Sequence, residues 1–349
     1  MDTKNIINTL VERKNLSESQ ATYAMKLMMT GEMTHSQIGS FLTALRLKGE
    51  TEDEITYMAK EMRKFSKKIN PKMKDVLIDT CGTGGDRVNT FNVSTISAFV
   101  LSGAGIYVAK HGNRSVTSKC GSADLLEGLG VKIDIQPDIV EKCIQDSGIG
   151  FMFAPIFHPS MKNVVKPRKE IGLRTVFNVL GPLTNPANAE VQLLGVYDEE
   201  LTYKIGKVLK KLGVKKACVV HGEGGIDEIT ITGKTRITEV EGNDIKCYTI
   251  DPRDFGFDLA KEKDILGGEL IDNVKITTNI LNGDLGPKTD MVILNSAVGL
   301  SLSGKAQDIK EGVEIARDII KNGKALKKLI KLIKVSGGNT EEIRYYLEG

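Results

Sequence analysis

The stretch 110–130 of this chain, KHGNRSVTSKCGSADLLEGLG, is crowded with polar, small and basic side chains. A core element would carry a periodic apolar stripe instead. Lys110 and Arg114 supply cations, and the serines and threonines supply hydroxyl donors, which together suit phosphate and ribose oxygens. A solvated basic loop is the plain alternative, but it does not explain His111 and Asn113 beside a row of hydroxyls. The stretch predicts a cradle for a small phosphorylated ligand.

A glycine-rich loop lies upstream, in the sequence DTCGTGGD of residues 79–86. The apolar run 76–79 predicts a buried strand before it, and 94–103 predicts a short helix after it, which Ser94 or Thr95 could cap. Strand, glycine loop and helix form the arrangement in which α/β proteins bind phosphates. The loop lacks the G-x-G-x-x-G spacing, and the chain has no Walker sequence, so a Rossmann oxidoreductase and a P-loop ATPase both lose support.

Two adjacent carboxylates, Asp227 and Glu228, follow the apolar run 217–220 and a glycine loop. Carboxylates at the end of a strand suit a hard cation such as Mg²⁺. An adjacent pair is more often a solvated turn, so these residues alone leave a metal site and a surface turn both open.

Several stretches, taken together and in order, resemble the anthranilate phosphoribosyltransferase family of tryptophan biosynthesis. They are DTCGTGGD (79–86), TFNVST (90–95), KHGNRSVTSKCGSADLLEGLG (110–130), FAPIFHPSMKNV (153–164), GLRTVFNVLGPLTNP (172–186), QLLGVY (192–197) and HGEGGIDEI (221–229). The resemblance runs through most of the chain. It implies transfer of a phosphoribosyl group from 5-phosphoribosyl 1-pyrophosphate to the amine of anthranilate, with release of pyrophosphate.

The resemblance also implies a role for particular residues. Phosphoribosyl pyrophosphate is expected on Gly82, Gly85, Asp86, Thr90, Asn92, Val93, Ser94, Thr95, Lys110, His111, Gly112, Asn113, Arg114, Ser115, Val116, Thr117, Ser118 and Ser122. Magnesium, as two ions, is expected on Ser94, Asp227 and Glu228. Anthranilate is expected on Gly82, Asn113, Arg168, His111, His158 and Pro182.

Arg168 has the clearest chemical role in this set, because a guanidinium can bind the anthranilate carboxylate with two hydrogen bonds and so orient the amine. No catalytic acid or base is assigned. The amine of anthranilate is already neutral near pH 7, and pyrophosphate leaves well once cations neutralise its charge. His111 is therefore expected to position or pack rather than to accept a proton. The chain departs from the commoner family wording at Lys166, before Pro167, and at Arg87, after GTGGD.

The composition agrees with a globular enzyme that binds small anionic ligands. The chain has 349 residues, 40% of them hydrophobic and 27% charged, and its net charge of +3 is too small to argue for nucleic acid. Its five cysteines are scattered without C-x-x-C pairs, which indicates reduced thiols and a cytoplasmic location. No targeting segment is visible, and the longest mildly apolar run, near 291–302, is too short to cross a membrane.

The elements that must position these residues fall into two parts. Residues 1–72 predict a small all-helical domain, because they carry three capping-box patterns and no strand. Residues 73–349 predict a large α/β domain with a mostly parallel central sheet flanked by helices. Strands are expected over 76–80, 106–109, 131–135, 150–153, 193–197 and 217–221, with a hairpin formed by 229–232 and 235–238.

The resemblance adds three expectations about assembly. A segment near 165–190 returns to the helical domain, the site lies in a cleft between the domains, and the chain forms a homodimer through its helical part. The basic stretch 325–334 has its apolar residues on a single stripe, so we interpret it as a helix buried in the core rather than a helix on a membrane. The sequence does not indicate whether a glutamine amidotransferase associates with the chain.

Two rival functions follow from the same fold family. A pyrimidine nucleoside phosphorylase would be favoured if Arg168, Asn113 or the Asp227 and Glu228 pair were missing, and all are present. A relative that binds nucleic acid without catalysis would be expected to carry a strong basic excess and a degraded anthranilate site, and the sequence has neither.

Overall fold

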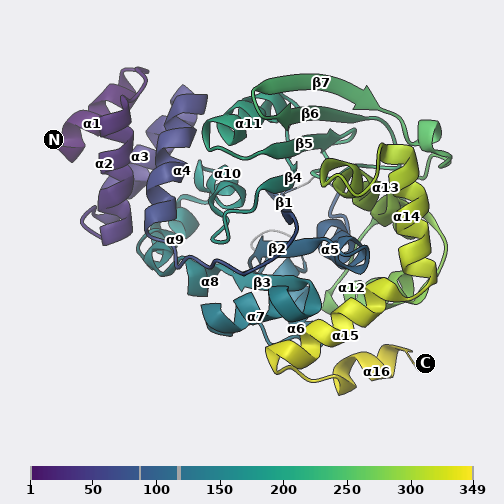
Figure 1. Ribbon diagram of the computed structural model, residues 1–349. Helices are drawn as coiled ribbons and strands as arrows, with labels where there is room; N and C mark the ends of the chain where they lie inside the picture. The colour runs from purple at the N-terminus through teal and green to yellow at the C-terminus, as the bar shows by residue number, and fades with distance from the viewer. Residues whose placement is uncertain (1, 86–87, 116–118, 348–349) are drawn as a thin grey trace.

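A seven-stranded sheet forms the centre of the computed structural model, counted over the residues that it describes, 2–85, 88–115 and 119–347 (Figure 1). The strand order is β3-β2-β1-β4-β5-β6-β7. The first five strands in this order pair in parallel, and the last two add as an antiparallel hairpin. The predicted α/β class with a mostly parallel sheet is confirmed. The strands are β1 (Leu77–Gly82), β2 (Tyr107–Gly112), β3 (Ile149–Phe153), β4 (Val191–Gly195), β5 (Lys216–Gly222), β6 (Thr235–Glu241) and β7 (Asp244–Ile250).

Helices cover both faces of the sheet, and each face has its own hydrophobic cluster. On β5, Cys218 and Val220 join one cluster, whereas Ala217 and Val219 join the other, as side chains that alternate across a strand must. The first cluster is completed by α5 (Val93–Gly103), α13 (Pro287–Leu302) and α15 (Lys324–Ser336), and the second by α11 (Glu200–Lys211). The parallel strands are therefore largely buried on both sides, as expected of a sheet covered by helices.

Four helices precede the sheet, α1 (Thr3–Val11), α2 (Glu18–Thr30), α3 (His35–Lys48) and α4 (Glu52–Lys64). The three predicted capping boxes are confirmed, at Ser17, Thr34 and Thr51. A much later helix, α9 (Lys162–Ile171), packs against α2 and α3 (Figure 1). The buried hydrophobic side chains of α1 to α4 belong to the same cluster as α11, and α4 packs against α11.

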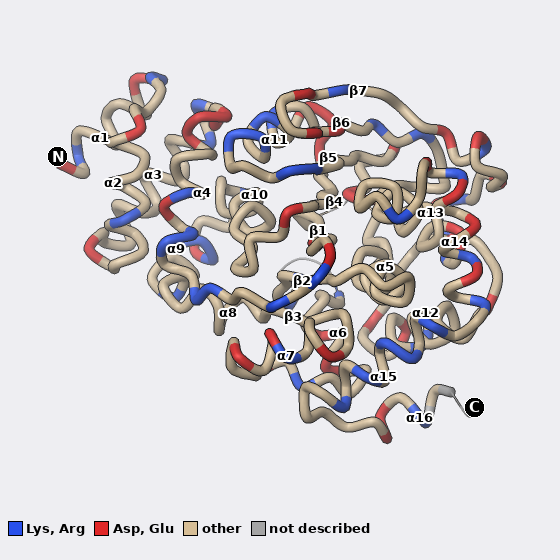
Figure 2. The backbone as a smooth tube through the Cα atoms, viewed as in Figure 1, with Lys and Arg blue, Asp and Glu red and all other residues tan. Residues whose placement is uncertain are grey.

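The remaining helices surround the sheet, and acidic and basic residues are spread along the chain (Figure 2). They are α6 (Ser122–Gly128), α7 (Pro137–Ser147), α8 (Ala154–Phe157), α10 (Phe177–Leu180), α12 (Leu270–Asn282), α14 (Ile309–Lys321) and α16 (Glu341–Leu347). The core interpretation of 325–334 is confirmed, since Leu329 and Ile333 of α15 are fully buried. None of the described helices combines the length and the apolarity that crossing a bilayer requires.

Two predicted strands are wrong. Residues 131–135 form no strand, and their apolar side chains are buried by helices near the start of α16, where Asn339 donates its N–H to the Gly130 carbonyl over 2.9 Å. Residues 229–232 form no hairpin strand either. The hairpin consists of β6 and β7, and the Ile229 N–H and carbonyl are instead bound by the side chain of Asn295 on α13, over 3.0 and 2.7 Å.

Candidate functional site

The glycine loop after β1 is tied to the ends of two other chain segments. Thr83 donates its N–H to the carbonyl of Gly195, the last residue of β4, over 2.9 Å. Gly84 donates its N–H to Oδ2 of Asp227 over 2.7 Å. A Cβ atom at Gly82 would collide with the same carboxylate. The close approach of Asp227 therefore requires glycine at position 82.

A third attachment of this loop comes from Arg174, which lies between α9 and α10. Its guanidinium donates to the carbonyl of Gly85 and stacks on the ring of Tyr197, with 4.1 Å between the guanidinium carbon and the ring centroid. Gly85 has a φ of +77°, where L side chains rarely fit. Sequence reasoning missed Arg174, although it lies in the quoted stretch 172–186, because nothing in the pattern indicates that this arginine reaches the loop.

Helix α5 begins directly beside the glycine loop, with its N-terminus next to the predicted carboxylates. The prediction that Ser94 or Thr95 caps this helix is wrong, because Asn92 occupies the cap position and both residues lie in the first turn. The Ser94 N–H donates to Oε1 of Glu228 over 3.1 Å. An acidic side chain here is stabilised by the free N–H groups and the dipole of the helix. The hydroxyls predicted at the start of a helix and the carboxylates predicted after a strand are thus brought together.

Lys110 lies at the centre of this arrangement and is only 2% exposed. Its ammonium group donates to the Thr80 carbonyl over 2.6 Å and to Oγ of Ser94 over 3.3 Å. Burial raises the pKa of Glu228 to about 8, with the negative charge of Asp227 acting in the same direction and the Lys110 ammonium opposing it. Two carboxylates and one ammonium are therefore held out of water at the carboxyl end of the sheet, where further positive charge would be favourable.

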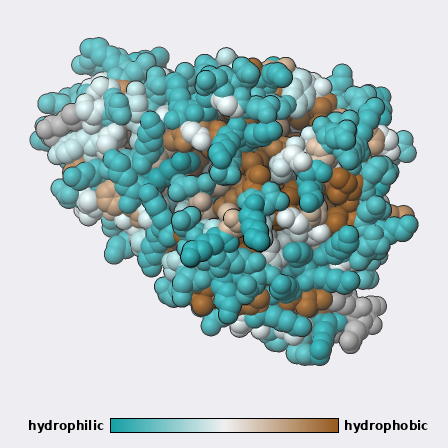
Figure 3. All heavy atoms as spheres, viewed as in Figure 1, coloured by the Kyte–Doolittle hydropathy of each residue, from teal (hydrophilic) through white to brown (hydrophobic). Residues whose placement is uncertain are grey.

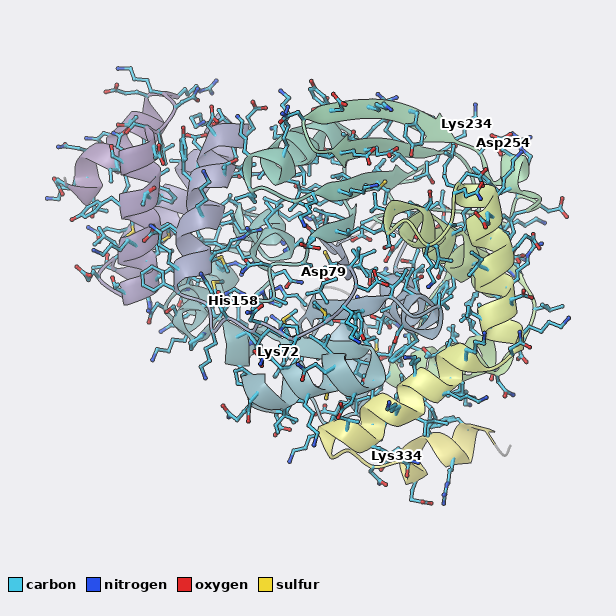
Figure 4. The ribbon with its side chains drawn as sticks, viewed as in Figure 1. Lys72, Asp79, His158, Lys234, Asp254 and Lys334 are labelled. Carbon is cyan, nitrogen blue, oxygen red and sulfur yellow. The ribbon has the colours of Figure 1, made fainter. Side chains whose placement is uncertain are left out.

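Two histidines, His111 on β2 and His158 after α8, have ring centroids 5.0 Å apart. His111 belongs to the polar segment 110–122, from the end of β2 to the start of α6, which we call the second loop. Burial lowers the pKa of His111 to about 3 and that of His158 to about 4, so both rings are neutral near pH 7. Within the described part of the chain, Nε2 of each ring is buried without a hydrogen-bond partner. Figure 4 shows His158 between the N-terminal helices and Asp79 on β1. The Asp79 carboxylate accepts the backbone N–H of His111 over 3.3 Å, and burial raises the pKa of Asp79 to about 6.

The second loop has an exposed outer part, centred on Arg114. Its guanidinium pairs with Asp124 and Glu127 of α6, over 3.0 and 2.8 Å, and these two partners raise its pKa. The same Asp124 accepts the N–H of Ser115 over 2.9 Å. Ser122, at the start of α6, donates its hydroxyl to the Asn113 carbonyl over 3.4 Å. Arg114 is therefore held by carboxylates of the chain itself rather than pointing into open space.

The predicted acceptor residues come from the connection between β3 and β4. Arg168 on α9 lies over the ring of Phe177, with 5.2 Å between the guanidinium carbon and the centroid, and burial lowers its pKa. Among the described residues it makes no ion pair. Pro182 opens a short 3₁₀ turn (Pro182–Thr184), and its carbonyl accepts from Gln192 on β4 over 2.7 Å. On the face of the molecule that Figure 3 shows, hydrophobic residues gather toward the middle, with hydrophilic residues around them.

The other predicted site residues have the following places. Val93 and Thr95 are buried, and their N–H groups donate to Phe91 and Asn92. Thr90 forms a backbone bridge to Leu266, and Gly112 has no room for a Cβ beside Ser122 and Phe151. Asp86, Val116, Thr117 and Ser118 lie outside the described residues.

Cys81 and Cys120, which belong to these loops, are buried. Burial raises the pKa of both thiols, that of Cys120 to about 12, so neither favours the reactive thiolate.

Comparison with known proteins places this arrangement in a family. Residues 74–326 match the glycosyl transferase family, a/b domain, and residues 4–66 match the glycosyl transferase family, helical bundle domain. The chain is 52% identical over 331 residues to the anthranilate phosphoribosyltransferase of Acetivibrio thermocellus, with 95% of this chain and 96% of that protein covered. The chain belongs to the anthranilate phosphoribosyltransferase family. It is therefore an enzyme, a glycosyltransferase of tryptophan biosynthesis.

Further relatives agree with this membership. The anthranilate phosphoribosyltransferase of Persephonella marina is 49% identical over 336 residues, covering 96% of this chain and 99% of that one. The crystal structure of the Thermus thermophilus enzyme superposes with a TM-score of 0.90 at 37% identity, covering 95% and 99% of the two chains. The Saccharomyces cerevisiae enzyme in complex with phosphoribosyl pyrophosphate and magnesium superposes with a TM-score of 0.88 at 31% identity, covering 96% and 98%.

Proposed function

We propose that the loops at the carboxyl ends of β1, β2, β4 and β5 are where this enzyme transfers the phosphoribosyl group of 5-phosphoribosyl 1-pyrophosphate to the amine of anthranilate, giving N-(5-phosphoribosyl)anthranilate and pyrophosphate in L-tryptophan biosynthesis. One observation carries this assignment. Buried Lys110 contacts Ser94 at the N-terminus of α5, and the same turn of helix binds Glu228. Donors for an anion and carboxylates for a cation thus converge on one end of the sheet.

The donor side of the site consists of the glycine loop, the first turn of α5 and the second loop. Gly82 and Gly85 give backbone access, and Ser94 and Lys110 provide buried donors for the pyrophosphate. Arg114 adds a cation at the rim, where its surface ion pairs can be exchanged for phosphate oxygens. The protein thereby stabilises negative charge that grows on the leaving pyrophosphate, which is the main requirement of this reaction.

The residues present fit magnesium. Asp227 and Glu228 are adjacent and buried, and their mutual repulsion would be relieved by a divalent cation. Over the described residues no group of three His, Cys, Asp or Glu side chains could hold a metal, so substrate phosphates and water would supply the other ligands, as Mg²⁺ prefers. We propose that Ser94, Asp227 and Glu228 hold two ions. When bound, magnesium neutralises and orients the pyrophosphate.

The acceptor side rests on Arg168. Its guanidinium is half-buried and, within the described part of the chain, has no carboxylate partner, so an anthranilate carboxylate would complete its hydrogen bonds. The neutral rings of His111 and His158 suit an aromatic substrate better than a charged wall would. With Asn113 and Pro182 they line the path that we assign to anthranilate. Neither histidine is needed as a base, because the amine arrives neutral.

We also propose the organisation around this site. The helical domain comprises residues 1–72 together with the returning segment near 165–190, and residues 73–349 form the phosphoribosyl pyrophosphate-binding domain. The packing of α9 on α2 and α3 supports the return of this segment to the helical domain.

Pairing of two copies through the helical part is supported by exposed Leu47 on α3 and by a hollow between α1 and α3. A cytoplasmic location is supported by the five cysteines, none of which forms a disulfide in the described part of the chain and four of which are buried. Light scattering checks the dimer, and cell fractionation checks the location.

The proposed activity is tested by following anthranilate fluorescence in purified enzyme supplied with phosphoribosyl pyrophosphate and magnesium. Fluorescence should fall as the amine is phosphoribosylated, and omission of either phosphoribosyl pyrophosphate or magnesium should abolish the change. Chromatography of the products should show pyrophosphate in equal amount to the anthranilate consumed. Unchanged fluorescence at every magnesium concentration would refute the proposal.

A further inference from the structure

The glycine loop is held from three directions, and the three attachments differ in origin. Two of them come from the side of the sheet: the Gly195 carbonyl ends β4, and the Asp227 carboxylate lies in the loop that follows β5. The third is the guanidinium of Arg174, which reaches the carbonyl of Gly85 from the connection between α9 and α10. This connection begins immediately after the helix that carries Arg168.

Arg174 is itself held in place by a neighbour. Its guanidinium lies on the ring of Tyr197, at 4.1 Å from the centroid, and Tyr197 follows the end of β4. A guanidinium stacked on an aromatic ring keeps its edge N–H groups free to donate in the plane of the stack. The donor aimed at Gly85 is therefore oriented by the ring, whose residue lies two positions beyond the end of β4.

Gly85 is the residue of this loop whose backbone conformation the anchor restricts most directly. It has a φ of +77°, follows Gly84 with a φ of +69°, and gains no side-chain contact of its own. Two consecutive glycines give the unanchored chain many accessible conformations, and ordering them has an entropic cost. A hydrogen bond to the Gly85 carbonyl selects one conformation before the ligand arrives.

We infer that Arg174 is a positioning residue for the donor substrate, which holds the glycine loop in its phosphate-binding conformation and links that loop to the segment carrying the acceptor arginine. The inference rests on the proposed function of the site. Arg174 does not contact the reacting atoms in this account. It acts through Gly85, so its removal should weaken binding of phosphoribosyl pyrophosphate and leave the chemical step largely unchanged.

The test is steady-state kinetics of Arg174→Ala beside three other variants. In Arg174→Ala the KM for phosphoribosyl pyrophosphate should rise about tenfold, which is the effect of ordering one further residue on binding. The KM for anthranilate and kcat should each change less than about threefold. Arg174→Lys keeps one donor for the carbonyl and should recover most of the loss. Tyr197→Leu should act in the same direction, and the double variant Arg174→Ala/Tyr197→Leu should be no worse than Arg174→Ala alone.

Arg317→Ala is the matched control. Arg317 also lies over an aromatic ring, that of Phe257 at 5.1 Å, and pairs with Glu314 on α14, away from the glycine loop. Its removal should leave both KM values unchanged. A KM for phosphoribosyl pyrophosphate that stays within twofold in Arg174→Ala, or a fall confined to kcat, would overturn the inference, and so would an equal effect in Arg317→Ala.

Two measurements keep this test separate from the proposed function. Hydrogen exchange of peptides spanning residues 79–91 in the ligand-free enzyme should be faster in Arg174→Ala than in the wild type, and unchanged exchange would contradict the inference. Calorimetric titration with phosphoribosyl pyrophosphate and magnesium measures binding without turnover. A wild type that binds this compound but consumes no anthranilate refutes the proposed function, and the weaker binding expected of Arg174→Ala then decides the inference alone.

Discussion

The inner and outer parts of the second loop are built on opposite principles. Lys110, in the inner part, is 2% exposed, and its ammonium group donates hydrogen bonds to the Thr80 carbonyl and the Ser94 hydroxyl. Arg114, only four residues later, has a side chain that is 46% exposed and pairs with carboxylates on the surface of α6. The first cation belongs to a network that is largely buried, whereas the second is exposed enough to exchange its partners.

The difference teaches how this fold prepares a site for a highly charged ligand. Buried charges are costly unless they are paired, so the inner groups must be present together, and removing one leaves the others uncompensated. Surface ion pairs contribute about 0–1 kcal/mol each, so the outer groups can be rearranged at little cost when phosphate oxygens arrive. We therefore expect inner substitutions to have large effects and outer substitutions to have small ones.

The largest effect is expected from Asp227→Asn/Glu228→Gln, which keeps the shape of the inner pair and removes its charge. Turnover should fall by about a thousandfold or more, because magnesium would lose its protein ligands. Thermal stability should fall as well, since the buried Lys110 ammonium loses negative charge that compensates it. Magnesium titrations of activity, together with thermal unfolding curves, check both parts. Activity within tenfold of the wild type at saturating magnesium would break the comparison.

A somewhat smaller effect is expected from Arg168→Ala, in which a half-buried cation without a carboxylate partner among the described residues is removed. The kcat/KM for anthranilate should fall about 10- to 100-fold, in line with about 1.5–3 kcal/mol for hydrogen bonds to a charged group. The KM for phosphoribosyl pyrophosphate should change little. Lys169→Ala, the exposed neighbour on α9, is the control and should behave as the wild type. Equal weakening of both substrates would contradict the role of Arg168.

The pH dependence of stability probes the buried histidines. Their folded-state pKa values, about 3 and about 4, lie below the ordinary value of 6.5, so the unfolded chain binds more protons as the pH falls below 6.5. Their contribution to stability is present above pH 6.5 and is lost on acidification. Asp79, with its pKa raised to about 6, contributes in the opposite sense and partly masks the effect. The histidines are therefore best assessed by difference.

His111→Gln/His158→Gln removes both titrating rings and leaves Asp79 in place. Between pH 7.5 and pH 5, the wild type should lose about 4 kcal/mol more stability than this variant, because each ring that stays neutral in the folded state contributes about 1.4 kcal/mol for each pH unit below 6.5. Urea unfolding at the two pH values, each with its own wild-type control, measures the difference. An identical pH dependence in both proteins would show that the rings titrate normally, and thus that they are not sealed from water.

The sequence predicted the parts of this architecture that depend on short-range patterns. Capping boxes at Ser17, Thr34 and Thr51 are local, and each starts a helix as expected. Apolar runs predicted β1 to β5, but the same signal failed at 131–135, where helices rather than strands bury the side chains. A short apolar run records burial and not the element that provides it. The failed cap at Ser94 also reflects the folded structure, because the helix begins earlier, with Asn92 at the cap position, and a distant carboxylate, Glu228, accepts the Ser94 N–H in its first turn.

The site was predictable as a set of residues and much less so as a set of contacts. The family resemblance supplied Lys110, Arg168 and the carboxylate pair, but no sequence pattern indicated that Arg174 reaches Gly85 across 89 residues of chain. The charge states were also beyond the sequence. Burial sets the raised pKa of Glu228 and the lowered pKa of His111, and burial is decided by packing between distant segments.

The smallest effect is expected at the rim, from Glu127→Ala. This change removes one of the two carboxylates that hold Arg114, at a site where all three side chains are at least partly exposed. Stability should change by less than about 1 kcal/mol. The KM for phosphoribosyl pyrophosphate should stay within about threefold of the wild type, and a fall should be largest at low salt, where the freed guanidinium attracts phosphate most strongly.

Glu314→Ala is the matched control for Glu127→Ala, because Glu314 forms an exposed pair with Arg317 on a helix outside the site. It should leave the KM unchanged at every salt concentration. A tenfold rise in KM for Glu127→Ala, with no change for Glu314→Ala, would mean that the Arg114 ion pair is part of the working cradle. The outer part of the loop would then be preassembled like the inner one, and exposure would no longer separate exchangeable cations from structural ones.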